Sequence, residues 1–230
     1  MHYIKTTSIF LLFTFSVYSQ NNLNLNNLQT FEVVKIIAQK SNQNSLDLSK
    51  ITGSPYSMET FTLAKVERAN KKASANLFLR YNGYNDEIEI GESTTQLTSE
   101  EALLKDKNLR ATFNNNTYQF ITFSSKKDKP TDGYLIVLYT GKNYRLFRQD
   151  KTKLSEGRLA KTSLEKDIAP RFRKVKSFYV AQGNGMPIEI DLKIKSIRKQ
   201  LRTKDLSKSK GMKKIKSEEK LITFFENLEQ

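Results

Sequence analysis

Short stretches in which apolar and polar residues alternate recur along the middle of the chain, separated by glycine, asparagine and proline. An alternation of this kind is typical of β-strands with one buried face, and the separating residues favour tight turns. The pattern predicts a mainly β fold over residues 52–192, either an antiparallel β-meander sheet or a partly closed barrel. The expected strands cover 61–67, the hairpin 77–90, 109–113, 117–123, 134–139, 144–148, 177–182 and 188–192.

The hairpin at 77–90 is the clearest of these units. Asn82-Gly83 favours a two-residue turn, whereas a four-residue loop over 82–85 places Arg80 opposite Glu87. It also aligns apolar residues across the two strands, and each such pair stabilises a sheet by about 0.2–1 kcal/mol. The second register is therefore preferred. Both registers predict the same orientations, with Leu77, Leu79, Ile88 and Ile90 facing the core and Arg80, Glu87 and Glu89 facing solvent.

Other segments differ in how clearly they predict structure. Residues 134–139 are an unbroken apolar run, as expected of a central strand covered on both faces. The asparagines at 114–116 tolerate the left-handed backbone of a tight turn. Residues 31–38 fit a helix by spacing and a strand by their β-branched content, and both remain open. Residues 151–170 have no strong period and are expected to be mostly loop.

The C-terminal segment 193–230 is different in character and predicts a basic helical tail packed on the sheet. Residues 193–216 contain eleven basic residues and one acid, with Ile194, Ile197 and Leu201 on one helical face. Ser217 is a good N-cap for a last helix, because two acids follow it where the helix dipole favours them. This helix has an apolar stripe that either packs against the sheet or docks on another protein: Leu221, Phe224, Phe225 and Leu228.

The N-terminal residues 1–19 have the layout of a secretory signal peptide. Lys5 precedes a short apolar run, and small residues precede a cleavage point between Ser19 and Gln20. The run is shorter than the roughly 20 residues that span a bilayer, and no later stretch is long and apolar enough. We therefore expect an exported protein, periplasmic or secreted, with a lead-in segment at 20–51 before the β domain.

Composition excludes several kinds of chemistry. The chain has no cysteine, and its one histidine, His2, lies in the expected signal peptide. The mature protein then lacks the groups for a Ser-His-Asp or Cys-His nucleophile, for a thiolate or imidazole zinc site, and for haem ligation by His or Cys. We expect no cofactor. The formal net charge of +15 favours anionic partners such as acidic polysaccharide, anionic lipid or an acidic protein. Nucleic acid is disfavoured by export.

The acidic residues around the hairpin are the main candidates for catalysis or metal binding. Asp86, Glu87, Glu89 and Glu92 could offer oxygen ligands to calcium, but their spacing does not match a calcium loop. Glu87 and Glu89 are separated as the two carboxylates of a glycosidase would be. Outward-facing acids on a strand are also common, so we expect a solvated strand face with no catalytic or metal site.

Several segments together resemble a family of uncharacterised exported proteins common in the Bacteroidota. The matching pieces are Thr52-Gly53-Ser54-Pro55-Tyr56, Leu79-Arg80-Tyr81-Asn82 with Asp86-Glu87-Ile88-Glu89, residues 134–146, Phe178-Tyr179-Val180 and the closing amphipathic helix. The resemblance implies a location in the cell envelope or outside the cell, and it supplies no activity.

The sequence thus predicts a non-enzymatic cell-envelope protein that acts by binding a protein or an anionic envelope polymer. The alternatives are a carboxylate-dependent hydrolase of the periplasm and a purely structural periplasmic component. The expected contacts to an anionic partner are the basic residues Lys193, Lys195, Arg198, Lys199, Arg202, Lys204, Lys208, Lys210, Lys213, Lys214 and Lys216.

Overall fold

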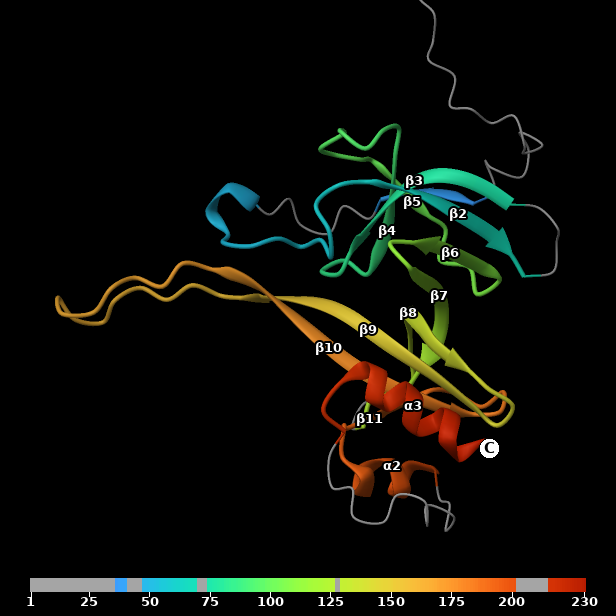
Figure 1. Cartoon of the computed structure of the whole chain (residues 1–230). Coiled ribbons are helices and arrows are strands. Elements are labelled where there is room, and N and C mark those ends of the chain that lie inside the picture. The colour runs from blue at the N-terminus through green and yellow to red at the C-terminus, as the bar shows by residue number, and fades with distance from the viewer. Residues whose placement is uncertain (1–35, 41–46, 70–73, 127–128, 202–214) are drawn as a thin grey trace, which may run out of the picture.

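The computed structural model describes residues 36–40, 47–69, 74–126, 129–201 and 215–230. Within these residues, eleven strands form one open sheet in which all neighbours are antiparallel, in the order β1-β5-β4-β3-β2-β6-β7-β8-β9-β10-β11 (Figure 1). The predicted mainly β, antiparallel sheet is confirmed, and the sheet is open. Its order differs from a simple meander at two places, where β1 pairs with β5 and β2 pairs with β6. The strands are β1 (Ile37–Gln39), β2 (Thr62–Arg68), β3 (Ser74–Asn82), β4 (Glu87–Gly91), β5 (Glu101–Leu103), β6 (Leu109–Phe113), β7 (Asn116–Phe123), β8 (Thr131–Thr140), β9 (Tyr144–Ser155), β10 (Arg171–Gln182) and β11 (Ile188–Ile190).

Three short helices complete the described structure. A 3₁₀ helix, η1 (Leu48–Lys50), precedes the sheet's main part, and α2 (Ile194–Leu201) and α3 (Glu218–Leu228) follow it. The described end of the 31–38 segment is strand, since β1 pairs with β5 at the sheet edge. The sheet therefore begins before residue 52. The expected signal peptide lies outside the described residues.

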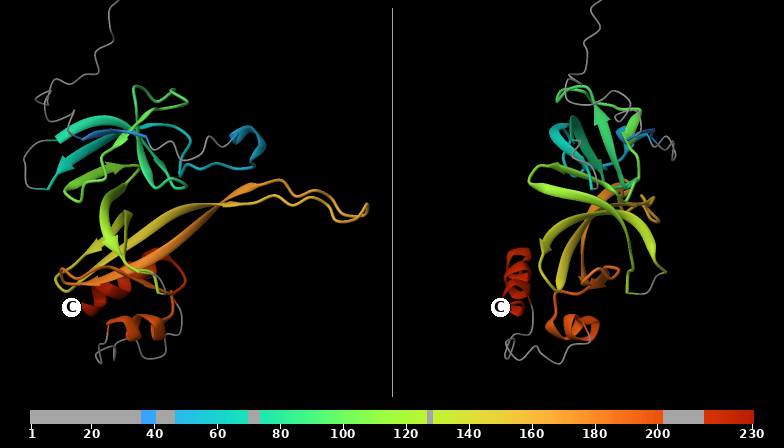
Figure 2. Two further views of the ribbon diagram at one scale, coloured as in Figure 1. Left: turned by 180° about the vertical axis from the view of Figure 1, so that it is seen from behind. Right: turned by 90° about the vertical axis from the view of Figure 1, so that its right-hand side faces the viewer.

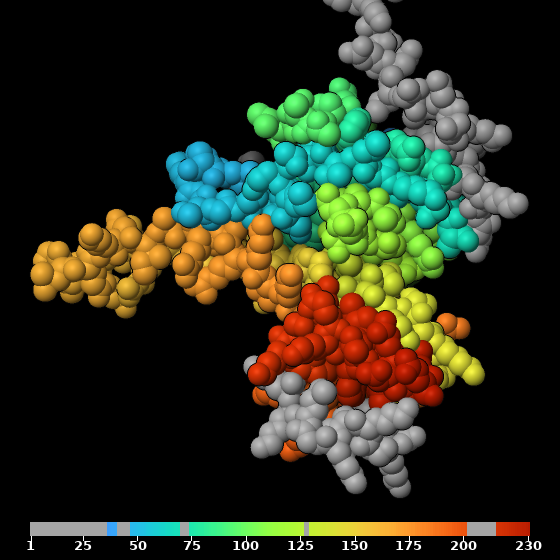
Figure 3. Space-filling view, viewed as in Figure 1, coloured from blue at the N-terminus to red at the C-terminus, as the bar shows by residue number. Residues whose placement is uncertain are grey.

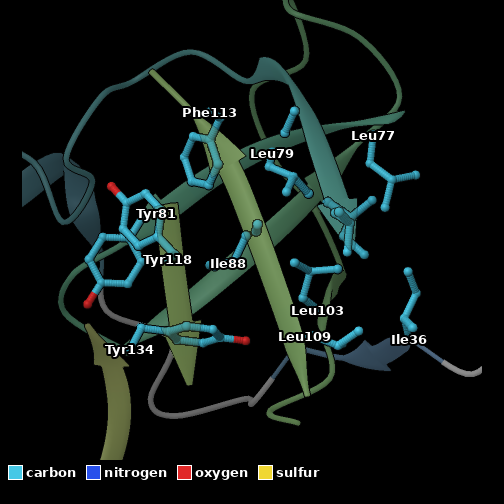
Figure 4. Packing of buried hydrophobic residues seen from close by; sticks show 14 of the residues in the cluster. Ile36, Leu77, Leu79, Tyr81, Ile88, Leu103, Leu109, Phe113, Tyr118 and Tyr134 are labelled. Atoms are coloured by element: carbon cyan, nitrogen blue, oxygen red, sulfur yellow. The ribbon is translucent and has the colours of Figure 1, made fainter. Parts of the chain in front are cut away.

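The sheet bends between a first half, β1–β7, and a second half, β8–β11 with α2 and α3 (Figures 1 and 2). Its buried apolar residues form separate cores. One face of β2–β8 forms the largest core, which is rich in aromatic rings (Figure 4). Tyr118 stacks on Phe113 at 4.6 Å between ring centroids and lies 5.1 Å from Tyr81. In the other half, Ser124 at the end of β7 forms a parallel bridge with Ile188, so edge strand β11 returns toward β7.

Strand β8 is central and covered on both faces, as its apolar run predicts. Tyr134 and Ile136 face the core of the first half, and Leu135 faces a second core with Phe147 of β9. The register between β8 and β9 shifts between Val137 and Tyr139. Beyond this bulge, Tyr139 turns toward the helices.

The turn at 114–116 also forms as expected. Asn114 and Asn115 have φ angles of 51° and 58°, in the left-handed region that asparagine tolerates. They join β6 and β7 into a hairpin in which Phe113 lies opposite Asn116. The turn chemistry of the sequence therefore fixes this register locally.

Helix α3 closes the outer face of β8–β10. Ser217 caps it, its Oγ accepting a hydrogen bond from the backbone N–H of Lys220 at 3.3 Å. The apolar stripe is buried against the sheet: Leu221 and Phe225 have no exposed surface, and the Phe225 ring lies 5.4 Å from that of Tyr144. The core that they form with α2 also contains Leu146, Val180, Ile190, Ile194, Ile197, Leu201, Ile215 and Phe224, with Leu228 packed at its margin.

Both ends of α3 are tied to the sheet by polar contacts. At its start, Arg148 of β9 donates from Nη1 to both carboxylate oxygens of Glu218, at 2.7 and 2.8 Å. At its end, Glu229 accepts hydrogen bonds from the Tyr139 hydroxyl at 2.6 Å and from three backbone N–H groups of the β8–β9 turn. Desolvation raises the pKa of Glu229, but these hydrogen bonds outweigh it and hold the pKa below its usual value.

The β3–β4 hairpin is present, but the preferred register is wrong by two residues. Arg80 lies opposite Glu89 rather than Glu87, and the loop comprises residues 83–86. Asn82 stays in β3, and its side-chain Oδ1 accepts hydrogen bonds from two N–H groups of the loop, both at 3.1 Å. Asn82 thus closes the loop as an Asx turn while it remains the last residue of β3. The hydrogen bonds of this turn outweigh the pairing of Arg80 with Glu87 that favoured the other register.

The expected exposure of Arg80, Glu87 and Glu89 is also wrong, because all three side chains are buried. Arg80 donates from Nη2 to Glu89 at 2.6 Å, and Lys40 lies 2.7 Å from the other oxygen of the same carboxylate. The segment before β2 crosses this face and covers the pair. Its rings of Tyr56 and Phe61 lie 3.6 and 4.2 Å from the Arg80 guanidinium carbon.

The loop predicted over 151–170 is shorter than expected. Strand β9 continues to Ser155 and β10 begins at Arg171, so the two strands form a long ribbon, with 156–170 as the connection. Contacts from the first half of the molecule stabilise this ribbon. Gly83 accepts a hydrogen bond from the N–H of Thr152 at 2.9 Å, and Thr52 bridges to Arg171. These contacts are distant in sequence and leave no local pattern.

Candidate functional site

A groove of about 610 Å³ opens on the inner side of the second half, at the end of its small core. Its walls come from the end of β7, the loop that follows it, the start of β8, the middle of β9 and β10, and β11. Four of its lining residues are lysines and one is acidic. The lining consists of Phe123, Ser125, Lys126, Lys129, Thr131, Gln149, Lys151, Lys153, Val175, Ser177, Tyr179 and Glu189.

The alternation of β9 places the groove residues on one face. Gln149, Lys151 and Lys153 line the groove, while the residues between them face the opposite side of the sheet. Of these intervening residues, Thr152 is buried against the first half of the molecule and Asp150 is half-buried. The strand can therefore hold its lysines in place without burying their charges.

The floor of the groove is apolar. Phe123 and Tyr179 are buried, with ring centroids 4.9 Å apart, and they belong to the core that includes Leu135 and Phe147. The Tyr179 hydroxyl donates to Gln149 Oε1 at 3.1 Å. This bond fixes the amide of Gln149 so that its nitrogen, a donor, is left for a ligand.

The ammonium groups around the groove are unevenly neutralised. Lys126 at one end forms an ion pair with Asp191. Lys129, Lys151 and Lys153 are exposed, and none of them forms an ion pair with the residues that the structure describes. The groove thus presents three ammonium groups without an ion pair, together with one carboxylate, Glu189, and neutral amide and hydroxyl groups, and its net positive charge attracts anions.

The basic residues predicted to bind an anionic partner are only partly described. Lys193, Lys195, Arg198 and Lys199 are exposed around α2, and Lys216 is exposed before α3. The buried face of α2 consists of its three apolar residues, as predicted. The six remaining basic residues of the prediction, at 202, 204, 208, 210, 213 and 214, lie outside the described residues.

The alternative use of the α3 stripe, docking on another protein, would need an exposed stripe. Leu221, Phe224 and Phe225 are instead part of the core, with at most 8% of their surface exposed. Leu228 is half-buried. Packing against the sheet, the other use considered, is what the structure shows.

The hairpin carboxylates do not form a reaction site. Glu89 has no exposed surface and is bound by Arg80, Lys40 and Asn82. Glu87 is also buried. A glycosidase needs two carboxylates that reach a substrate, and neither of these reaches the surface.

Asp86 has a structural role in the same hairpin. Its φ of 53° closes the loop, and its carboxylate accepts hydrogen bonds from the Tyr81 hydroxyl at 2.7 Å and the Tyr134 N–H at 3.1 Å. Burial raises the pKa of Asp86 above its ordinary value, although these hydrogen bonds oppose the shift. Asp86 therefore joins the hairpin to β8. In the described part of the chain, no three acidic or histidine side chains come close enough to hold a metal ion.

Sequence reasoning missed two of the groove lysines, Lys151 and Lys153, because it treated 151–170 as loop. The available signal was the alternation of Lys151 and Lys153 with a smaller residue between them, followed by a matching pair at Arg171 and Arg173. Such a pattern is consistent with two paired strands that carry basic residues on one face.

Comparisons with protein-family models, with curated proteins and with solved structures found no match. Among the described helices, none is both long enough and apolar enough to cross a bilayer.

Proposed function

We propose that this protein is an exported, non-enzymatic binding protein that holds an anionic polymer of the cell envelope in the groove between β7 and β11. The observation that carries the proposal is the row of exposed lysines, Lys129, Lys151 and Lys153, along one cavity. Export is supported by the layout of residues 1–19.

Size and charge favour ligand binding in this groove. Its volume lies in the range of about 300–1,000 Å³ that ligand sites occupy. Lys151 and Lys153 lie on one face of β9 and repel one another, and neither forms an ion pair with the described residues, although Lys151 lowers the pKa of the buried Asp86 through space. An anionic ligand would remove this repulsion.

The neutral groups of the groove favour a polysaccharide with acidic groups over a simple ion. Gln149, Ser125, Ser177 and Thr131 provide amide and hydroxyl groups that suit sugar hydroxyls. The lysines suit carboxylate or sulfate groups on the same chain. The groove is hollow, so a flat bilayer would not reach all of these groups together.

The test is a binding titration with polygalacturonate as the acidic polysaccharide and neutral dextran as the comparison. The Lys151→Gln/Lys153→Gln variant should weaken polygalacturonate binding about tenfold, because it removes two charge contacts. Lys161→Gln/Lys166→Gln, in the exposed connection 156–170, changes the charge equally and should bind like the unaltered protein.

A second pair separates the groove from the basic helix. If Lys195→Gln/Lys199→Gln on α2 loses binding while Lys151→Gln/Lys153→Gln keeps it, the basic segment is the site and the groove is not. If the unaltered protein binds polygalacturonate and dextran equally, or binds neither, the proposed function is wrong.

A further inference from the structure

The β9–β10 ribbon extends beyond the body of the molecule as an arm (Figures 1 and 2). The end of the arm carries exposed aliphatic side chains. Leu164 is 95% exposed, Leu159 77% and Ile168 49%. All three lie in the connection 156–170, here called the arm tip. In the space-filling view, the arm is a narrow projection, and on the face shown no other described part of the chain lies over its end (Figure 3).

The arm tip has a defined fold. Arg158 and Ile168 exchange two backbone hydrogen bonds of 2.8 Å. Asp167 accepts a hydrogen bond from the N–H of Ala160 at 2.7 Å, and Glu165 accepts one from the N–H of Lys161 at 3.2 Å. The side chains of Glu165 and Asp167 thus brace the loop that presents the leucines.

Basic residues follow immediately behind the arm tip. Arg171 and Arg173 are exposed on β10, and Arg173 lies directly opposite Lys153 of β9. Like charges in this position destabilise a sheet pair unless an anion separates them. Arg171 is three residues from Ile168, or about 10 Å of extended chain.

We propose that the arm tip inserts into an anionic lipid surface, with its aliphatic residues among the acyl chains and the arginines at the headgroups. The spacing matches the about 5–10 Å to which interfacial segments enter a bilayer. The tip is small and convex, which suits a deformable partner better than a protein interface of about 800 Å² per partner. The exposed aliphatic residues of the arm tip and the arginines behind them are independent of the groove and of the function proposed for it.

The arm tip is tested with vesicles of phosphatidylcholine, with and without phosphatidylglycerol. In a flotation assay the protein should bind the anionic vesicles, and Leu159→Gln/Leu164→Gln should weaken this binding about tenfold or more. The matched control is Leu63→Gln/Leu97→Gln, since these leucines are 60% and 83% exposed elsewhere on the surface. The control should bind like the unaltered protein.

Fluorescence gives a readout that does not depend on loss of binding. The chain has no tryptophan, so Leu164→Trp introduces a single indole. Its emission should shift to shorter wavelength when anionic vesicles are added, and that of Leu97→Trp should not. The inference is overturned if the unaltered protein does not float, if both leucine pairs have equal effects, or if the Leu164→Trp emission does not move. The leucine variants of the arm tip should bind polygalacturonate like the unaltered protein, because the groove residues are intact. Failure of the lipid proposal can therefore be distinguished from failure of the proposed function.

Discussion

The buried ion pair of the β3–β4 hairpin makes a strong prediction about stability. Glu89→Gln keeps the size of the side chain and removes its charge. Arg80 and Glu89 are 3% and 0% exposed, so the variant leaves a buried guanidinium without its counter-charge. Breaking such a pair costs about 3–5 kcal/mol. Glu67→Gln is the matched control, because its pair with Lys65 is about half exposed and should contribute about 0–1 kcal/mol.

Urea unfolding distinguishes the two variants. The free energy of unfolding falls by about 2 kcal/mol per M urea, so a loss of about 4 kcal/mol of stability lowers the urea midpoint by about 2 M. Glu67→Gln should shift it by less than about 0.5 M. If Glu89→Gln and Glu67→Gln have equal urea midpoints, then Glu89 faces water and the segment before β2 does not cover the Arg80–Glu89 pair. An Arg80→Met/Glu89→Leu variant should lose less than Glu89→Gln, since it leaves no lone charge of that pair.

Three further variants test other parts of the fold. Phe225→Ala should destabilise the protein by about 3–5 kcal/mol, and a small shift in thermal midpoint would mean that α3 is not part of the core. Gly83→Ala should cost about 1–3 kcal/mol, because its Cβ would lie 2.8 Å from the Asp150 carbonyl oxygen; an unchanged urea midpoint would contradict this packing. The pKa of Asp86 is raised in the folded state. The contribution of Asp86 to the free energy of unfolding is therefore greatest at low pH and is lost as pH rises through that pKa. Relative to the unaltered protein, Asp86→Asn should therefore become more stable as pH rises from below the ordinary Asp value of 3.8 through the raised pKa, and a relative loss over that rise would refute the assignment.

The parts of the fold that the sequence predicted are those with local causes. The run around Leu135 and Ile136 needs cover on both faces, and the structure places cores there. Asn114 and Asn115 fix a turn by their own backbone preference. The stripe of Leu221 and its neighbours follows from helical spacing.

The parts that sequence reasoning missed depend on contacts distant in the chain. Nothing in the alternation around Arg80 shows that Tyr56 and Phe61 cross over it. The extension of β9 depends on Gly83, whose carbonyl accepts a hydrogen bond from the N–H of Thr152. The groove could not be predicted for the same reason, since its walls come from strands separated by more than 60 residues.

The salt dependence of polygalacturonate binding tests the central claim most directly. Affinity should fall steeply as salt rises, because ligand binding replaces counterions around Lys129, Lys151 and Lys153. Lys151→Gln/Lys153→Gln should show a shallower dependence than both the unaltered protein and Lys161→Gln/Lys166→Gln. A dependence that is equally steep in all three proteins would contradict the account, because the ligand would then be held by charges outside the groove.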